Sequence, residues 1–282
     1  MNEGKVSVDS GANRLAALSP ARRKLFEQRL KGLSVAPAGI ARRRDTGPVA
    51  LSFAQQRLWF MDQLVPGNPF YNIPATLSLK FVLDVGVLRR CLNEIVRRHE
   101  SLRTTFAVLD DEPVQVVAPE LTLALPLHDL RPLASALREP EGLRIATAEA
   151  RTPFDLAKGP LIRARLLQLD TNDYRLLLTL HHIVADGWSM GVFFHELGVL
   201  YAQFAAGQPS PLVPLPVQYA DFALWQRGWL RGDVLEQQLA YWQRQLSGIP
   251  LLALPMDRPR PPMPTFRGAY YPLEFQIGRA HV

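Results

Sequence analysis

The stretch Leu180-His181-His182-Ile183-Val184-Ala185-Asp186-Gly187-Trp188-Ser189 places two adjacent histidines and an aspartate between an apolar run and a new amphipathic segment. The run before it, 175–180, is apolar on both faces, which predicts a strand in the middle of a covered sheet. The segment after it, 188–206, has the apolar spacing of a helix. Because consecutive residues of a strand point to opposite faces, one histidine can face a channel while the other is buried.

Helical and strand patterns alternate through the rest of the chain, which predicts the α/β class. Further helices are predicted at 53–64, 87–99 and 135–152, strands at 72–82, 161–169 and 174–181, and a hairpin formed by 102–109 and 113–117. The proline-rich connector 208–216 is stiff and extended, and it is the predicted boundary between two lobes. Beyond it we predict a helix-rich segment, 217–247, a stiff loop, 255–264, and a strand, 270–275.

The composition is that of a globular enzyme of 282 residues, with 48% hydrophobic and 21% charged residues. The net charge of +6 is concentrated in the first 45 residues, so nucleic-acid binding is not indicated. The single cysteine, Cys91, excludes an internal disulfide and fits a reducing cytoplasm. No transmembrane run, signal core or metal-ligand spacing is present, so we expect a cytoplasmic protein without membrane or metal partners.

The residues 181–187 match the pattern HHxxxDG, and three other segments, 52–60, 98–106 and 219–227, accompany it. Together, in this order, they resemble the core motifs of the condensation domains of nonribosomal peptide synthetases, whose two-lobed fold is similar to chloramphenicol acetyltransferase. The resemblance implies an α+β two-layer sandwich with the first lobe complete and the second only begun. A Gly-Trp-Ser run after Asp186 favours condensation over the related epimerization domains.

The resemblance also divides the chain. Residues 1–48 form a basic segment with a short helix, 49–208 the N-terminal lobe, 209–276 the start of a truncated C-terminal lobe, and 277–282 a non-native tail typical of translated sequencing-adaptor DNA. We expect the natural protein to continue and a lone lobe to be inactive. Residues 1–45 either dock an upstream synthetase subunit or pack beside the first lobe.

The implied reaction is amide-bond formation, in which a carrier-bound acceptor amine attacks a carrier-bound aminoacyl or peptidyl thioester. The first motif, followed by residues 71–74, most resembles elongation domains with an L-residue donor. No cofactor is bound directly. The substrates travel on phosphopantetheine arms of upstream and downstream peptidyl carrier proteins, and an adenylation domain is expected in the parent chain. The alternatives are a stand-alone acyltransferase that uses coenzyme A thioesters and a catalytically idle recruitment domain.

The family assigns catalysis to His182, either as a general base or as a hydrogen-bond acceptor that positions the amine. His181 is then a buried structural residue with a satisfied ring. The resemblance directs Asp186 away from the substrate and pairs it with an arginine of the second motif, Arg98 as first choice and Arg103 as the alternative.

Gly187 has two interpretations, a turn at positive φ that lets a substrate backbone approach closely, or an ordinary turn glycine. The apolar side chains of the following segment are predicted to form the core face of a helix: Trp188, Phe193, Phe194, Leu197 and Leu200. His99 and His195 have no partner signal, so we expect surface or packing roles for both.

Overall fold

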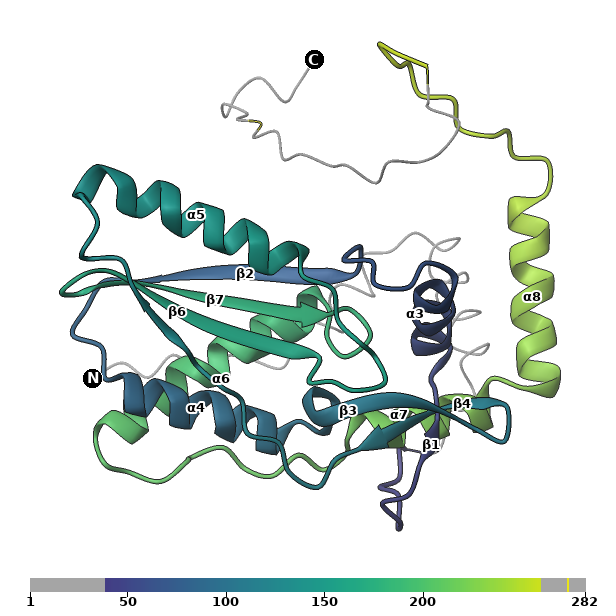
Figure 1. Ribbon diagram of the computed structural model, residues 1–282. Coiled ribbons are helices and arrows are strands. Elements are labelled where there is room, and N and C mark those ends of the chain that lie inside the picture. The colour runs from purple at the N-terminus through teal and green to yellow at the C-terminus, as the bar shows by residue number, and fades with distance from the viewer. Residues whose placement is uncertain (1–38, 260–272, 274–282) are drawn as a thin grey trace, which may run out of the picture. The chain divides into compact units, whose positions relative to one another are not determined.

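The computed structural model describes residues 39–259 and Leu273 (Figure 1). The chain divides into two compact units, residues 1–41 and 42–282, and all the helices and strands named below belong to the second. The predicted N-terminal helix and the tail 277–282 lie outside the described residues, as does the strand 270–275 apart from Leu273.

The central sheet has four strands in the order β2-β7-β6-β5. They are β2 (Asn72–Leu79), β5 (Leu127–Asp129), β6 (Ile162–Asp170) and β7 (Asp173–His181). β7 is antiparallel to both of its neighbours, whereas β5 is parallel to β6. The last six residues of β7 are all buried, so this strand is covered from both sides as its apolar run predicts.

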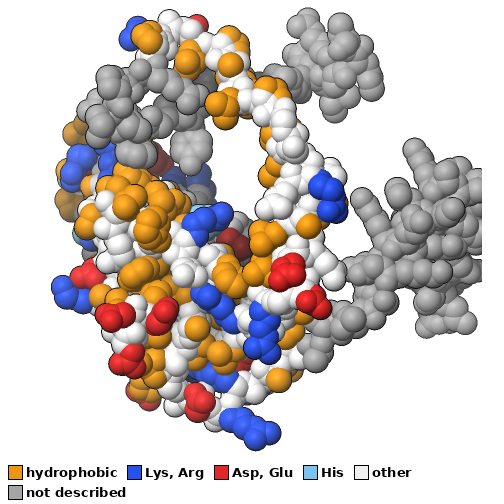
Figure 2. All heavy atoms as spheres, turned by 90° about the vertical axis from the view of Figure 1, so that its right-hand side faces the viewer, with side chains coloured by type: hydrophobic (Ala, Val, Ile, Leu, Met, Phe, Trp, Pro, Cys, Tyr) orange, Lys and Arg blue, Asp and Glu red, His pale blue; other side chains and the backbone are white. Residues whose placement is uncertain are grey.

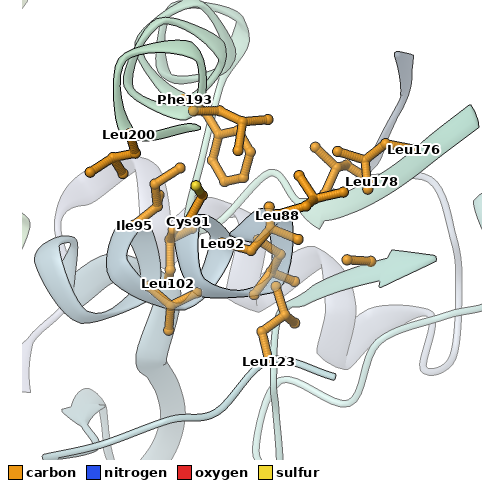
Figure 3. Packing of buried hydrophobic residues seen from close by; sticks show 14 of the residues in the cluster. Leu88, Cys91, Leu92, Ile95, Leu102, Leu123, Leu176, Leu178, Phe193 and Leu200 are labelled. Carbon is orange, nitrogen blue, oxygen red and sulfur yellow. The ribbon is translucent and has the colours of Figure 1, made fainter. Parts of the chain in front are cut away.

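Helices α4 (Val85–Arg98) and α6 (Gly187–Ala205) pack together over one face of this sheet (Figure 1). Figure 3 shows Leu88, Cys91, Leu92 and Ile95 of α4 meeting side chains of α6 and of β7. These α4 positions recur at helical spacing and are all at most 2% exposed, so the spacing alone accounts for the buried face.

Helix α5 (Ser135–Arg151) covers the opposite face, where its Ile145 and Ala146 pack on a cluster that contains Leu167 and Leu177. The α/β class is therefore confirmed. Helices cover the sheet on both sides, with α4 and α6 on one face and α5 on the other (Figure 1).

A second, smaller sheet has the order β1-β4-β3. It contains β1 (Val49–Ala50), β3 (Thr104–Leu109) and β4 (Glu112–Val117). Helix α3 (Phe53–Leu64) follows β1, and the short 3-10 helix η1 (Glu100–Arg103) leads into β3. The predicted hairpin is present, and its turn places Asp110 and Asp111 at positive φ, a conformation that aspartate tolerates better than most residues.

Helix α7 (Tyr219–Trp229) lies beyond the predicted lobe boundary but is bonded to the start of α3. Phe53 N donates to Gln226 Oε1 at 3.0 Å, and Arg227 Nε donates to Leu51 O at 2.7 Å.

Helix α8 (Gly232–Leu246) has no buried residue. Figure 2, which looks onto the side where α8 lies in Figure 1, shows hydrophobic side chains spread over this surface.

Arg43, which lies near the end of the basic segment 1–48, is anchored. Its backbone N donates to Asp221 Oδ1 at 3.0 Å, and its guanidinium pairs with Glu100 at 2.7 Å with 7% of the Arg43 side chain exposed. These two contacts anchor Arg43 to η1 and α7. The domain limits at 48 and 208 remain predictions.

Candidate active site

His181 and His182 stand at the end of the central strand. β7 ends at His181, whose N donates to Leu161 O at 3.0 Å, and His182 N extends the ladder by one bond to Tyr71 O at 2.8 Å. His181 is 2% exposed, which confirms its predicted burial, whereas His182 is exposed and lines a cavity. The two imidazoles thus have opposite surroundings, as the alternation of side chains along a strand requires.

The ring of His181 is satisfied inside the fold. Its Nδ1 accepts a hydrogen bond from Ile183 N at 3.1 Å, and Phe154 and Tyr71 meet it in edge-on contacts. Burial and, to a smaller extent, the neighbouring His182 lower the pKa of His181 to about 4. His181 is therefore neutral near pH 7 and is closed off from the cavity that His182 lines.

The cavity that His182 lines has a volume of about 600 Å³, within the range of small-molecule sites. It lies among α3, the end of α4, η1, the start of α6 and the start of α7. Its walls are largely apolar, with Leu58, Ile95, Leu102, Met190 and Phe193 among them. The polar side chains in the lining are Arg57, Tyr71, His99, Ser101, His182, Asp186, Ser189, Gln218 and Tyr219.

The start of α7 supplies one wall of this cavity, and several hydrogen bonds fix it. Tyr219 OH lies 2.9 Å from Ser52 Oγ, the residue that caps α3. Gln218 bridges two segments, since its Nε2 donates to Arg98 O at 3.0 Å and its Oε1 accepts from Glu100 N at 3.1 Å. These contacts join the first, second and fourth sequence motifs around one space.

Asp186 caps α6, and no arginine within residues 39–259 pairs with it. Its Oδ1 accepts from Ser189 N at 2.8 Å and from Ser189 Oγ at 2.7 Å. The Ser189 hydroxyl and backbone bonds hold the pKa of Asp186 below its usual range. The predicted ion pair between Asp186 and Arg98 or Arg103 is therefore wrong, because the carboxylate binds the N-terminus of its own helix.

The two arginines have other partners. Arg98 Nε donates to Glu196 Oε1 at 2.8 Å, and its Nη1 donates to Val213 O. Arg103 Nη1 donates to Ala118 O, and its Nη2 lies 3.8 Å from Glu100 Oε1. Arg98 thus stabilises a buried carboxylate further along α6, in place of the aspartate that the sequence suggested.

Gly187 is the first residue of α6, and its φ is not positive. A Cβ built on it meets no atom within 4 Å among the described residues. Of the two interpretations of Gly187, the turn at positive φ is therefore wrong, and no described backbone presses on this position.

Trp188 was predicted to join the core face of the helix, and this is wrong: it is 85% exposed at the rim of the cavity. Phe193, Leu197 and Leu200 are buried as predicted. Met190, two residues further along α6, is 8% exposed and belongs to the core, so the core face of the helix passes through Met190 and not through Trp188.

His99 has a partner that we did not predict, since its Nε2 lies 2.7 Å from Glu196 Oε2, and it also lines the cavity. A signal for this contact was present in the sequence. Glu196 falls three residues after Phe193 and next to Leu197, so it occupies the apolar stripe of the helix, where a carboxylate requires a partner.

Within residues 39–259, no group of three or more histidine, cysteine, aspartate or glutamate side chains is arranged to hold a metal ion. In the same range, no helix has the length and apolar character that crossing a bilayer requires.

The fold and the site define a lobe of the chloramphenicol-acetyltransferase type, in which a histidine at the end of the central strand opens into an apolar cavity. The family model of the condensation domain matches residues 46–280, so the chain belongs to the condensation domain family, as the motifs predict.

The chain is similar to parts of much larger proteins. It is 50% identical over 230 residues to a linear gramicidin synthase of Brevibacillus parabrevis, covering 81% of this chain and 3% of that protein. It is 45% identical over 260 residues to the phosphinothricin tripeptide synthetase PhsC of Streptomyces viridochromogenes, covering 91% of this chain and 24% of that protein. The chain thus spans a small share of the curated relatives it matches.

Among solved structures, the X-domain from teicoplanin biosynthesis superposes with a TM-score of 0.70 at 27% identity. The match covers 80% of this chain and 50% of that structure. The predicted chloramphenicol-acetyltransferase-like fold is confirmed by this agreement.

Proposed function

We propose that this lobe supplies the imidazole for amide-bond formation between two carrier-bound substrates, with His182 as the residue that meets the attacking amine. The observation that carries the proposal is the contrast between the two histidines. His182 opens into a cavity of about 600 Å³, whereas His181 is 2% exposed and bonded to the backbone.

The chemistry requires such a group. A free α-amine has a pKa of about 8, so near neutral pH much of it is protonated and cannot attack. His182 accepts the amine proton, or holds the neutral amine, while the nitrogen–carbon bond forms. The carbon–sulfur bond of the donor thioester then breaks, and the thiolate leaves and takes up a proton.

The size and apolar walls of the cavity suit a long, flexible arm with an acyl group at its end. Relatives named as a gramicidin synthase and a tripeptide synthetase support substrates delivered on phosphopantetheine arms of upstream and downstream carrier proteins. We also propose an elongation-type reaction with an L-residue donor and an adenylation domain in the same protein. Residues 1–45 would dock an upstream subunit, and the location would be cytoplasmic.

The test uses the full-length protein translated from the reading frame that holds this sequence. One carrier protein is loaded with a donor aminoacyl group and the other with an acceptor amino acid, and the dipeptidyl product is measured by mass spectrometry. We expect the amide on the acceptor carrier. Transfer from coenzyme A thioesters without product from the loaded carrier would instead identify a stand-alone acyltransferase. If neither donor gives a product, the domain is catalytically idle.

A further inference from the structure

His99 contributes a second imidazole to the cavity that holds His182. It is the last residue before η1, and its side chain is 22% exposed. One edge of the ring is already occupied, because Nε2 lies 2.7 Å from Glu196 Oε2.

Glu196 is well suited to orient this ring. Its side chain is 7% exposed, and its other oxygen, Oε1, accepts from Arg98 Nε at 2.8 Å. Arg98 is held in turn by Val213 O, so the carboxylate sits in one place with its charge already matched. Because an ionised carboxylate can only accept hydrogen bonds, the Nε2–H tautomer of His99 is the one that fits this contact.

This tautomer leaves Nδ1 of His99 as a hydrogen-bond acceptor. No hydrogen bond to His99 Nδ1 occurs among the residues that the structure describes. The lining of the cavity is largely apolar and includes Ile95, Leu102 and Phe193. An N–H group that enters this part of the cavity loses its water and needs an acceptor.

We propose that His99, oriented by the buried Glu196, is a second substrate-binding residue that accepts a hydrogen bond from an amide N–H of the bound thioester substrate. The proposal rests on the proposed function, since it takes a pantetheine-linked acyl chain as the occupant. That substrate has amide N–H groups in the arm and, when the donor is a peptide, in the acyl chain.

The test measures binding of a pantetheine thioether analogue, which cannot be cleaved, to the full-length protein by calorimetry. In His99→Gln, glutamine Nε2 can still donate to Glu196, but the acceptor at Nδ1 is lost. We expect wild-type thermal stability and about tenfold weaker binding, as for one lost hydrogen bond in a dry site. His195→Gln is the matched control, because His195 is exposed on the same helix as Glu196 and does not line the cavity.

Two further analogues locate the N–H group that binds His99. In one, an ester oxygen replaces an amide N–H of the pantetheine arm, and in the other it replaces an amide N–H of the acyl chain. We expect one of these esters to bind wild type about tenfold more weakly than the parent analogue, and its affinity to fall no further in His99→Gln. If His99→Gln does not fold, this comparison on wild type decides alone.

Unchanged affinity of folded His99→Gln would overturn the proposal, as would ester analogues that all bind wild type as tightly as the amide. So would a wild-type protein that makes the dipeptide but does not bind any pantetheine analogue. Dipeptide formation by wild type, measured separately, tells failure of this inference apart from failure of the proposed function.

Discussion

His181 is kept neutral by its surroundings, and this couples the stability of the lobe to pH. Its pKa falls from 6.5 to about 4 on folding, so the unfolded chain binds more protons between these values. The contribution of His181 to the stability of the folded lobe is fully present above pH 6.5 and is lost as the pH falls toward 4. We predict a loss from this group of about 3 kcal/mol in the free energy of unfolding, measured by urea denaturation across that range.

The control is His181→Asn, whose side-chain oxygen can accept the bond from Ile183 N and does not titrate. Its free energy of unfolding should change less between pH 6.5 and 4 than that of wild type. Equal pH dependence in both proteins would show that His181 is not the group responsible.

Gly187 offers a second prediction at this scale. Its position at the start of α6 has open space for a Cβ and no positive φ, so Gly187→Ala should leave the free energy of unfolding unchanged or raise it by up to about 1 kcal/mol. Gly159 is the contrasting site, with φ +59° and a Cβ position 2.9 Å from Thr105 Cγ2. Gly159→Ala should cost about 1–2 kcal/mol or more. The reverse ranking in urea denaturation would contradict the geometry.

At the scale of single residues, the motif predicted the environments of both histidines but not the partner of Asp186. The alternation along β7 is enforced by the backbone, so it can be seen in the sequence. A carboxylate at a helix start can bind either its own helix or a distant arginine, and only the folded structure decides between them.

At the scale of elements, Asp186 belongs to the N-terminus of α6. A lost helix cap costs about 1 kcal/mol, whereas breaking a buried ion pair costs about 3–5 kcal/mol. We predict the smaller loss for Asp186→Ala and a near wild-type value for Asp186→Ser, because serine also caps helices. Urea denaturation distinguishes the two magnitudes, and a loss above about 3 kcal/mol would restore the ion-pair interpretation.

Most elements of the described lobe were predictable. The helices and strands of the central sheet fall within a few residues of their expected limits, because long apolar periods and turn residues mark them. β1 and β5, with two and three residues, were missed since such short strands show no periodicity. Their pairing is decided by the longer strands beside them.

At the scale of the whole molecule, the cavity depends on contacts between segments far apart in the sequence. Arg43 pairs with Glu100, and its backbone binds Asp221 of α7. Arg43→Ala removes a charge-assisted bond between largely buried groups, so we predict a loss of about 2 kcal/mol in the free energy of unfolding. Arg44→Ala is the control, because Arg44 is exposed. Equal effects of the two substitutions would show that Arg43 is not an anchor.

These long-range contacts explain why the cavity was less predictable than the fold. Local patterns give α4, α6 and α7 separately, but the sequence does not show that Gln218, His99 and His182 meet. Hydrogen bonds of Gln218 and Tyr219 join the start of α7 to the first and second motifs, and His182 of the third motif lines the same cavity.

The central claim is that the His182 imidazole assists amide formation in the cavity. The most direct measurement is the single-turnover rate of dipeptide formation by the full-length protein with His182→Ala, beside the exposed control His195→Ala. Loss of a general base or of a positioning group predicts a rate about 10²- to 10⁴-fold lower for His182→Ala and an unchanged rate for the control. A His182→Ala protein that forms the dipeptide at the wild-type rate would contradict the account.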